Sequence, residues 1–213
     1  MKAPEIDYRQ ASLGFVSPKT GWKQILGLIF KELCPDKKNW FGAVLSLISG
    51  GIVAWFVGTS DQTVSITDTI CTVFLEVQIA IFSCLLAAYS ILLAFLDDKY
   101  IKILLKINYK GSQNYLKAGT QYYESAMYIY VLAILISLGV KLCISCMPLD
   151  FILTKNPIAN ELLAFGLLFV YLTYSIRATY EIKSIVTNTA SLFGGSLAFR
   201  IQAFAQSLEN ENE

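Results

Sequence analysis

The chain has 213 residues, of which 55% are hydrophobic and only 15% are charged, whereas soluble domains carry roughly 25% charged residues. The formal net charge is +1 and histidine is absent, so composition gives no electrostatic indication of nucleic-acid binding and removes the usual acid, base and metal ligand of neutral pH. These values exclude an ordinary soluble domain and predict an all-α integral membrane protein.

The N-terminal segment, residues 1–39, is expected to be cytoplasmic and to lack a cleavable signal peptide, because its first twenty residues are polar and have no apolar core. Between Gly21 and Cys34 the apolar residues follow helical spacing, while the charged residues lie elsewhere around the helix. This pattern predicts an amphipathic helix in the membrane interface, with an apolar face of Trp22, Ile25, Leu26, Ile29 and Leu33.

The first predicted span, Trp40 to Thr59, contains no charged residue and would be about 30 Å long as a helix, the thickness of a bilayer's hydrocarbon core. Small residues recur at every fourth position and therefore on one helix face: Gly42, Ser46, Gly50, Ala54 and Gly58. They predict a groove for close helix packing. The groove would seat either another helix of the same chain, which is the simpler interpretation, or a helix of a second subunit.

The second span is predicted at about Val77 to Leu96, after a polar crossing at Asp61 to Thr72. It ends at Asp97 and Asp98, and an amphipathic segment follows. Because the lysines of this segment alternate with apolar residues, we expect them to contact anionic lipid headgroups or a cytoplasmic partner. These lysines are Lys99, Lys102, Lys106 and Lys110.

The third span is predicted at about Ser125 to Met147, with Lys141 near enough to the far interface to extend toward water. The fourth is predicted at about Ile158 to Ile176 and ends at Arg177. Four transmembrane helices thus form a domain of residues 40–176.

Two cytoplasmic parts with amphipathic helices are predicted to flank these spans, a middle loop at about 97–124 and a C-terminal segment of residues 177–213. The C-terminal segment is expected to break at Gly194 and Gly195. Beyond the break, one helical face is apolar: Leu197, Ile201, Phe204 and Leu208.

The positive charges predict the orientation of the chain. Of 17 lysines and arginines, all but Lys141 and Lys155 lie in the tails or the middle loop. Cytoplasmic loops of membrane proteins carry the excess of lysine and arginine. We therefore expect a multi-pass protein of the cell inner membrane with both termini in the cytoplasm.

A polar stripe recurs every seven residues along the second span: Glu76, Ser83, Ser90 and Asp97. Residues seven apart lie on nearly the same helix face. One hypothesis is a water-accessible path or pore with Glu76 at its outer mouth and Asp97 at its inner mouth. The simpler interpretation is that the acids mark helix ends and the serines bond to their own helix backbone.

Three cysteines are predicted at the outer ends of the second and third spans: Cys71, Cys143 and Cys146. Most simply they are inert, but a disulfide between Cys71 and either partner is an alternative. The order CISC also resembles quinone-linked disulfide-oxidising membrane proteins, which place such a pair at the outer end of a helix in a four-helix bundle. Those proteins need a second redox pair in an outer loop, which this sequence does not supply.

The sequence contains no nucleophile with a base, carboxylate pair, phosphate-binding glycine loop or cluster of metal ligands. We therefore expect neither an enzyme nor a cofactor or metal site. The lipid bilayer and other copies of the chain are the expected partners, with a cytoplasmic protein as a further candidate and no direct nucleic-acid binding.

The block SILLAFLDDKYIKILLK, Ser90 to Lys106, resembles small multi-pass proteins of bacterial anti-phage loci. In these four-helix effectors of CRISPR-, retron- or cyclic-nucleotide-associated systems, an apolar span ends in acids and continues as a lysine-bearing helix. The resemblance implies an effector that oligomerises and compromises the inner membrane when a cytoplasmic partner signals. The alternatives are a non-conducting anchor or sensor that recruits a cytoplasmic partner and, more weakly, a thiol oxidoreductase that uses Cys143 and Cys146.

Overall fold

The computed structural model describes residues 22–33, 40–95, 101, 108–109, 113–148, 151–152 and 156–211. Its elements are α2 (Trp22–Leu33), α3 (Trp40–Gly58), α4 (Thr63–Phe95), β1 (Asn108–Tyr109), β2 (Gln113–Asn114), α6 (Tyr115–Ser145), α7 (Pro157–Tyr180) and α8 (Ile182–Glu211). The strands β1 and β2 form a two-residue antiparallel ladder before α6, and the rest of the fold is helical.

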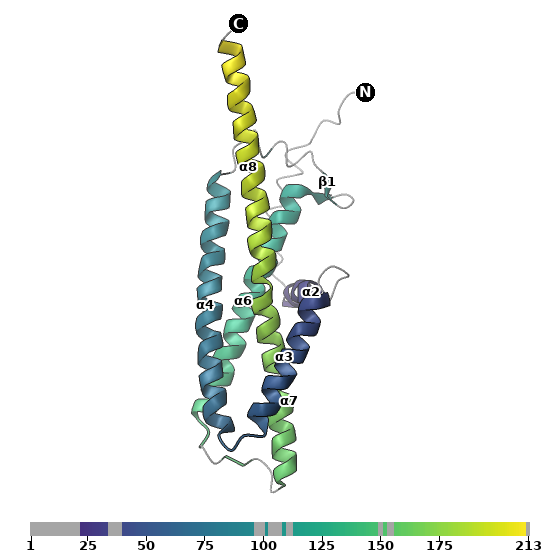
Figure 1. Cartoon of the computed structure of the whole chain (residues 1–213), viewed down its shortest axis with the longest axis vertical. Helices are drawn as coiled ribbons and strands as arrows, with labels where there is room; N and C mark the ends of the chain where they lie inside the picture. The colour runs from purple at the N-terminus through teal and green to yellow at the C-terminus, as the bar shows by residue number, and fades with distance from the viewer. Residues whose placement is uncertain are drawn as a thin grey trace.

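In the part of the chain that the structure describes, four helical segments are long and apolar enough to cross a membrane: Trp40–Gly58, Thr63–Ala94, Gly119–Ser145 and Pro157–Gln202. The prediction of an all-α multi-pass membrane protein with four spans is therefore confirmed. Helices α3, α4, α6, α7 and α8 run along one long axis (Figure 1). In that view, α3 lies beside the lower part of the bundle, whereas α8 projects beyond the upper end of α4.

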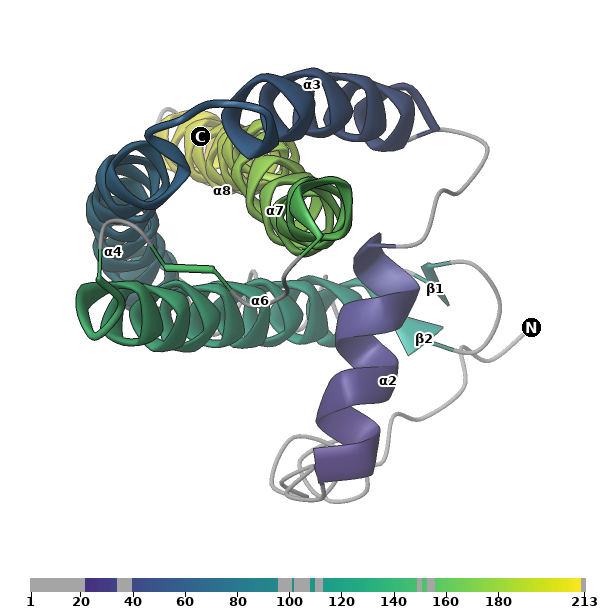
Figure 2. The same ribbon diagram turned by 90° about the horizontal axis from the view of Figure 1, so that it is seen from below.

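The bundle consists of two helix pairs. Helix α3 packs most extensively against α7, and α4 packs most extensively against α6, as the end-on view shows (Figure 2). The pairs meet where α6 faces α7, and tyrosine hydroxyls join them there. Tyr130 donates to the carbonyl of Ala178 over 2.8 Å, and Tyr174 donates to the carbonyl of Ile129 over 3.2 Å.

The predicted polar crossing at 61–72 is wrong for most of its length, because α4 already begins at Thr63. Only residues 59–62 form the turn after α3. The threonines that suggested a loop bond back to their own helix instead, as Thr67 does to the carbonyl of Thr63 (2.6 Å) and Thr72 to that of Asp68 (2.9 Å). Such bonds satisfy polar side chains inside an apolar span.

The predicted helix break at Gly194 and Gly195 is also wrong, because α8 runs through both glycines. The break lies at Glu181, whose N–H bonds to the carbonyl of Ala178 at the end of α7. A glycine costs a helix only about 1 kcal/mol, which the surrounding helix formers offset.

Arg177, predicted to end the fourth span at the water interface, belongs to α7, and its side chain is buried.

The predicted amphipathic helix is present as α2, which lies across the bundle axis rather than along it (Figure 2). Ile29 is buried in a cluster with Ile129 and Ala133 of α6 and Ala178 of α7. Phe30, in contrast, is 66% exposed. This crosswise placement suits a helix in a membrane interface, although its membrane location remains a prediction.

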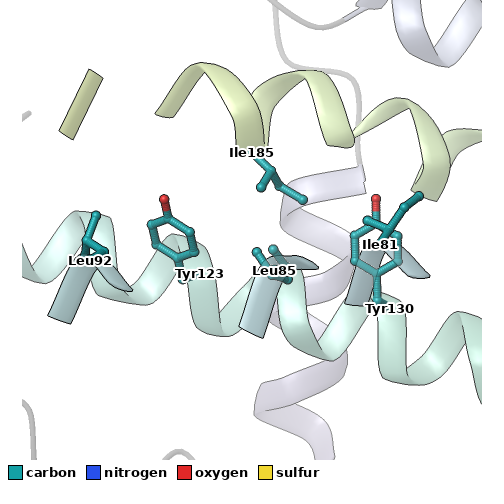
Figure 3. Packing of buried hydrophobic residues seen from close by; sticks show 7 residues of the cluster. Ile81, Leu85, Leu92, Tyr123, Tyr130 and Ile185 are labelled. Atoms are coloured by element: carbon teal, nitrogen blue, oxygen red, sulfur yellow. The ribbon is translucent and has the colours of Figure 1, made fainter. Parts of the chain in front are cut away.

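A further core cluster holds the upper half of the bundle together (Figure 3). Ile81, Leu85 and Leu92 of α4 pack against Tyr123 and Tyr130 of α6, with Ala126 and Ile185 completing the cluster. Because Ile185 belongs to α8, this cluster fixes α8 to the pair formed by α4 and α6.

Candidate membrane-embedded polar sites

The groove of small residues on α3 is filled by α7 of the same chain. All five members, Gly42, Ser46, Gly50, Ala54 and Gly58, are buried. A methyl group added at Gly50 would lie 2.8 Å from Oγ1 and 3.0 Å from the backbone nitrogen of Thr173. At Gly58 it would lie 3.1 Å from the backbone nitrogen of Phe165. The two backbones therefore approach so closely that this face holds one subunit together.

A hydrogen-bonded network lies inside the bundle, where α4, α6 and α7 meet. Ser137 donates to Oε1 of Gln78 over 2.8 Å, and the hydroxyl of Tyr171 donates to Ser137 over 3.1 Å. Gln78 and Ser137 are fully buried. Because lipid offers no competing hydrogen bonds, this network is expected to tie the two helix pairs together.

Replacing Ser137 with alanine is expected to destabilise the protein by about 1–2 kcal/mol, because Gln78 and Tyr171 would each lose a buried partner. The matched control is Ser83→Ala, since the Ser83 hydroxyl is exposed and bonds only to the carbonyl of Ile79 in its own helix. Thermal unfolding in detergent micelles measures the difference. Equal stability of the two variants would show that the network contributes nothing.

Lys141, for which the sequence suggested only an extension toward water, pairs with Asp68 of α4, and its side chain stays 28% exposed. Its Nζ lies 2.8 Å from Oδ1 and 2.9 Å from Oδ2 of Asp68, and 2.7 Å from Oγ1 of Thr72. The pair can form because the carboxylate of Asp68, near the start of α4, faces the end of α6. The pair neutralises both charges at the end of the bundle that carries the α3–α4 turn.

A second ion pair lies deep in the structure, where α7 meets α8. The guanidinium of Arg177 contacts the carboxylate of Glu181, with side-chain exposures of 5% and 8%. The guanidinium also lies 6.0 Å from the ring of Tyr180, which covers Gly42 of α3. This charge pair therefore joins the α7–α8 junction to the start of the first span.

The predicted polar stripe lies on the outside of the bundle. Glu76, Ser83 and Ser90 are all exposed, and both serines bond to carbonyls of their own helix. Asp97, which would complete the stripe, lies outside the described residues, as do Lys99, Lys102, Lys106 and Lys110. The serine bonds agree with the simpler interpretation of the stripe. The position of Glu76 does not, because Glu76 lies inside α4 and not at a helix end.

Glu76 is level with the middle of the first span rather than at an outer mouth, and two contacts establish its depth. Its neighbour on α4, Phe74, packs edge-on against the ring of Tyr171, with centroids 6.2 Å apart. Tyr171 lies two residues from Thr173 on α7, and Thr173 contacts Gly50 near the middle of α3. The misplacement arose because α4 begins about four turns earlier than predicted.

The described cysteines Cys71, Cys84, Cys143 and Cys146 are free thiols. Cys71 is fully buried in a cluster with Leu168 and Tyr171 of α7, whereas Cys143 and Cys146 are exposed. Cys71 therefore packs against α7, and the disulfide suggested with Cys143 or Cys146 is not formed.

Comparisons with known proteins found no match: no family model, no curated protein and no solved structure is similar to this chain.

Proposed function

We propose that this protein self-associates in the inner membrane and alters membrane permeability, with helix α4 of each copy lining the path. The observation that carries the proposal is the exposed carboxylate of Glu76, level with the middle of a span. An ionisable side chain at that depth is costly when it faces lipid. The cost is avoided if this face of α4 meets other copies and water.

The residues around Glu76 suit such an assembly. Along the exposed face of α4, small residues recur at alternating intervals of three and four residues: Ala80, Ser83, Ala87, Ser90 and Ala94. This is the spacing of a helix-packing seam, and small residues let helices in membranes approach closely. Since the groove on α3 is occupied by α7, α4 offers the better surface for another copy.

Bulky residues on this seam should prevent assembly. In Ala80→Phe and Ala87→Phe, the purified protein is expected to shift from an oligomer to a monomer in lipid nanodiscs, and its expression should no longer depolarise cells. The control is Leu135→Phe, because Leu135 is 53% exposed on α6 and belongs to no seam. A monomeric wild-type protein that leaves the membrane potential unchanged would refute the proposal.

The resemblance to anti-phage effectors supports a defensive role, in which a cytoplasmic signal triggers assembly. Overexpression of the chain alone bypasses this signal, whereas cells that express it at its natural level with its genomic neighbours would lose membrane potential only after phage infection. Both termini would lie in the cytoplasm, where the signal arises. Depolarisation of the latter cells without infection would contradict the trigger but not the assembly.

A non-conducting anchor is the second candidate, and one feature of α8 favours it. Leu197 and Ile201 are 61% and 60% exposed in the C-terminal half of α8, the helix that projects beyond α4 (Figure 1). This apolar face would suit a cytoplasmic protein partner. The anchor predicts co-purification of a soluble partner, together with no conductance in bilayers.

A further inference from the structure

The proposed path has one unpaired formal charge per copy within the span, that of Glu76, and we infer that it selects cations over anions. The inference rests on the proposed function, since only an assembly brings several Glu76 carboxylates to one level. Residues 63–94 of α4 contain no lysine or arginine. Their other acid, Asp68, is already neutralised by Lys141 of α6.

Glu76 has no such cationic partner among the described residues, unlike Asp68 with Lys141 and Glu181 with Arg177. Its exposed neighbours one turn away, Val73 and Ala80, are uncharged. The negative charge on this face of α4 is therefore not cancelled within one subunit. Because copies inserted in the same orientation place this residue at equal depth, their carboxylates would form a ring.

A ring of carboxylates attracts cations and repels anions, which is how acidic rings confer selectivity on cation channels. Hydroxyl groups lie seven residues away in both directions, on Thr69 and Ser83, and both side chains are exposed. Oxygen atoms are the ligands that alkali and alkaline-earth cations prefer. The expected permeant class is thus small inorganic cations, with the carboxylate ring as the discriminating element.

Selectivity is measured with the full-length protein in bilayers of neutral phosphatidylcholine across a tenfold gradient of potassium chloride. The current through the wild-type protein is expected to reverse near the potassium equilibrium potential. Glu76→Gln should shift the reversal potential toward zero, and Glu76→Lys should shift it toward the chloride equilibrium potential. Glu76→Asp keeps the charge and should keep the selectivity, which separates lost charge from misfolding.

The control is Glu161→Gln, since Glu161 is exposed near the start of α7 and should leave the reversal potential unchanged. Anion selectivity in the wild type, or unchanged selectivity in Glu76→Gln, would overturn the inference and leave the proposed function standing. A wild type that assembles but carries no current would refute both. Equal shifts in Glu161→Gln and Glu76→Gln would also overturn it, because the charge would then act from the membrane surface.

Discussion

Replacing Gly50 with leucine is expected to destabilise the fold by more than about 3 kcal/mol, at the upper end of what an overpacked core costs. The first added carbon would already lie 3.0 Å from the backbone nitrogen and 3.2 Å from Cα of Thr173. Backbone atoms cannot rotate away as a side chain can, so α3 and α7 must separate. The measurement is the thermal unfolding midpoint of the purified protein in detergent.

The matched control is Gly166→Leu, a substitution of the same size on α7. Gly166 is exposed, and a methyl group added there would meet no atom within 4 Å. This variant is expected to unfold within about 1 kcal/mol of the wild type. If both variants were equally stable, the close approach of α3 to α7 would not exist in the membrane.

Breaking the buried pair between Arg177 and Glu181 should have an effect of similar size. Arg177→Leu leaves the Glu181 carboxylate buried without its guanidinium, and the loss of one partner of a buried pair costs about 3–5 kcal/mol. Glu181→Leu should cost a comparable amount for the opposite reason. Each effect is measured as a fall in the free energy of unfolding.

The double variant, Arg177→Leu with Glu181→Leu, distinguishes a charge pair from two independent contacts. It is expected to be more stable than either single variant, since it leaves no buried charge uncompensated. As a control, Lys183→Leu removes an exposed cation two residues beyond Glu181 and should change stability by less than about 0.5 kcal/mol. Additive losses in the double variant would contradict the coupling.

The fold could be predicted from the sequence wherever one helix carries the whole signal. The absence of charges between Trp40 and Thr59 predicted a span, and α3 ends within one residue of that range. The small residues at every fourth position from Gly42 to Gly58 likewise predicted a packing face. Such patterns depend only on helix periodicity and hydropathy, which are local properties.

Contacts between helices could not be predicted in the same way. Lys141 and Asp68 are separated by 73 residues, and only the fold brings them together. A signal did exist, because these are opposite charges at the same predicted end of two spans. The predicted start of α4 is wrong because the polar residues at 61–72 are typical of a loop, whereas threonine can also bond to its own helix.

Water must reach position 76 if helix α4 lines a path through the membrane. In a variant without native cysteines, a cysteine at position 76 (Glu76→Cys) is exposed to a charged, membrane-impermeant thiol reagent in intact membranes, with Leu135→Cys as the lipid-facing control. We expect the reagent to modify the thiol at 76 and to leave the thiol at 135 unmodified. Protection of both positions would contradict it, because the exposed face of α4 would then lie against lipid or protein without water.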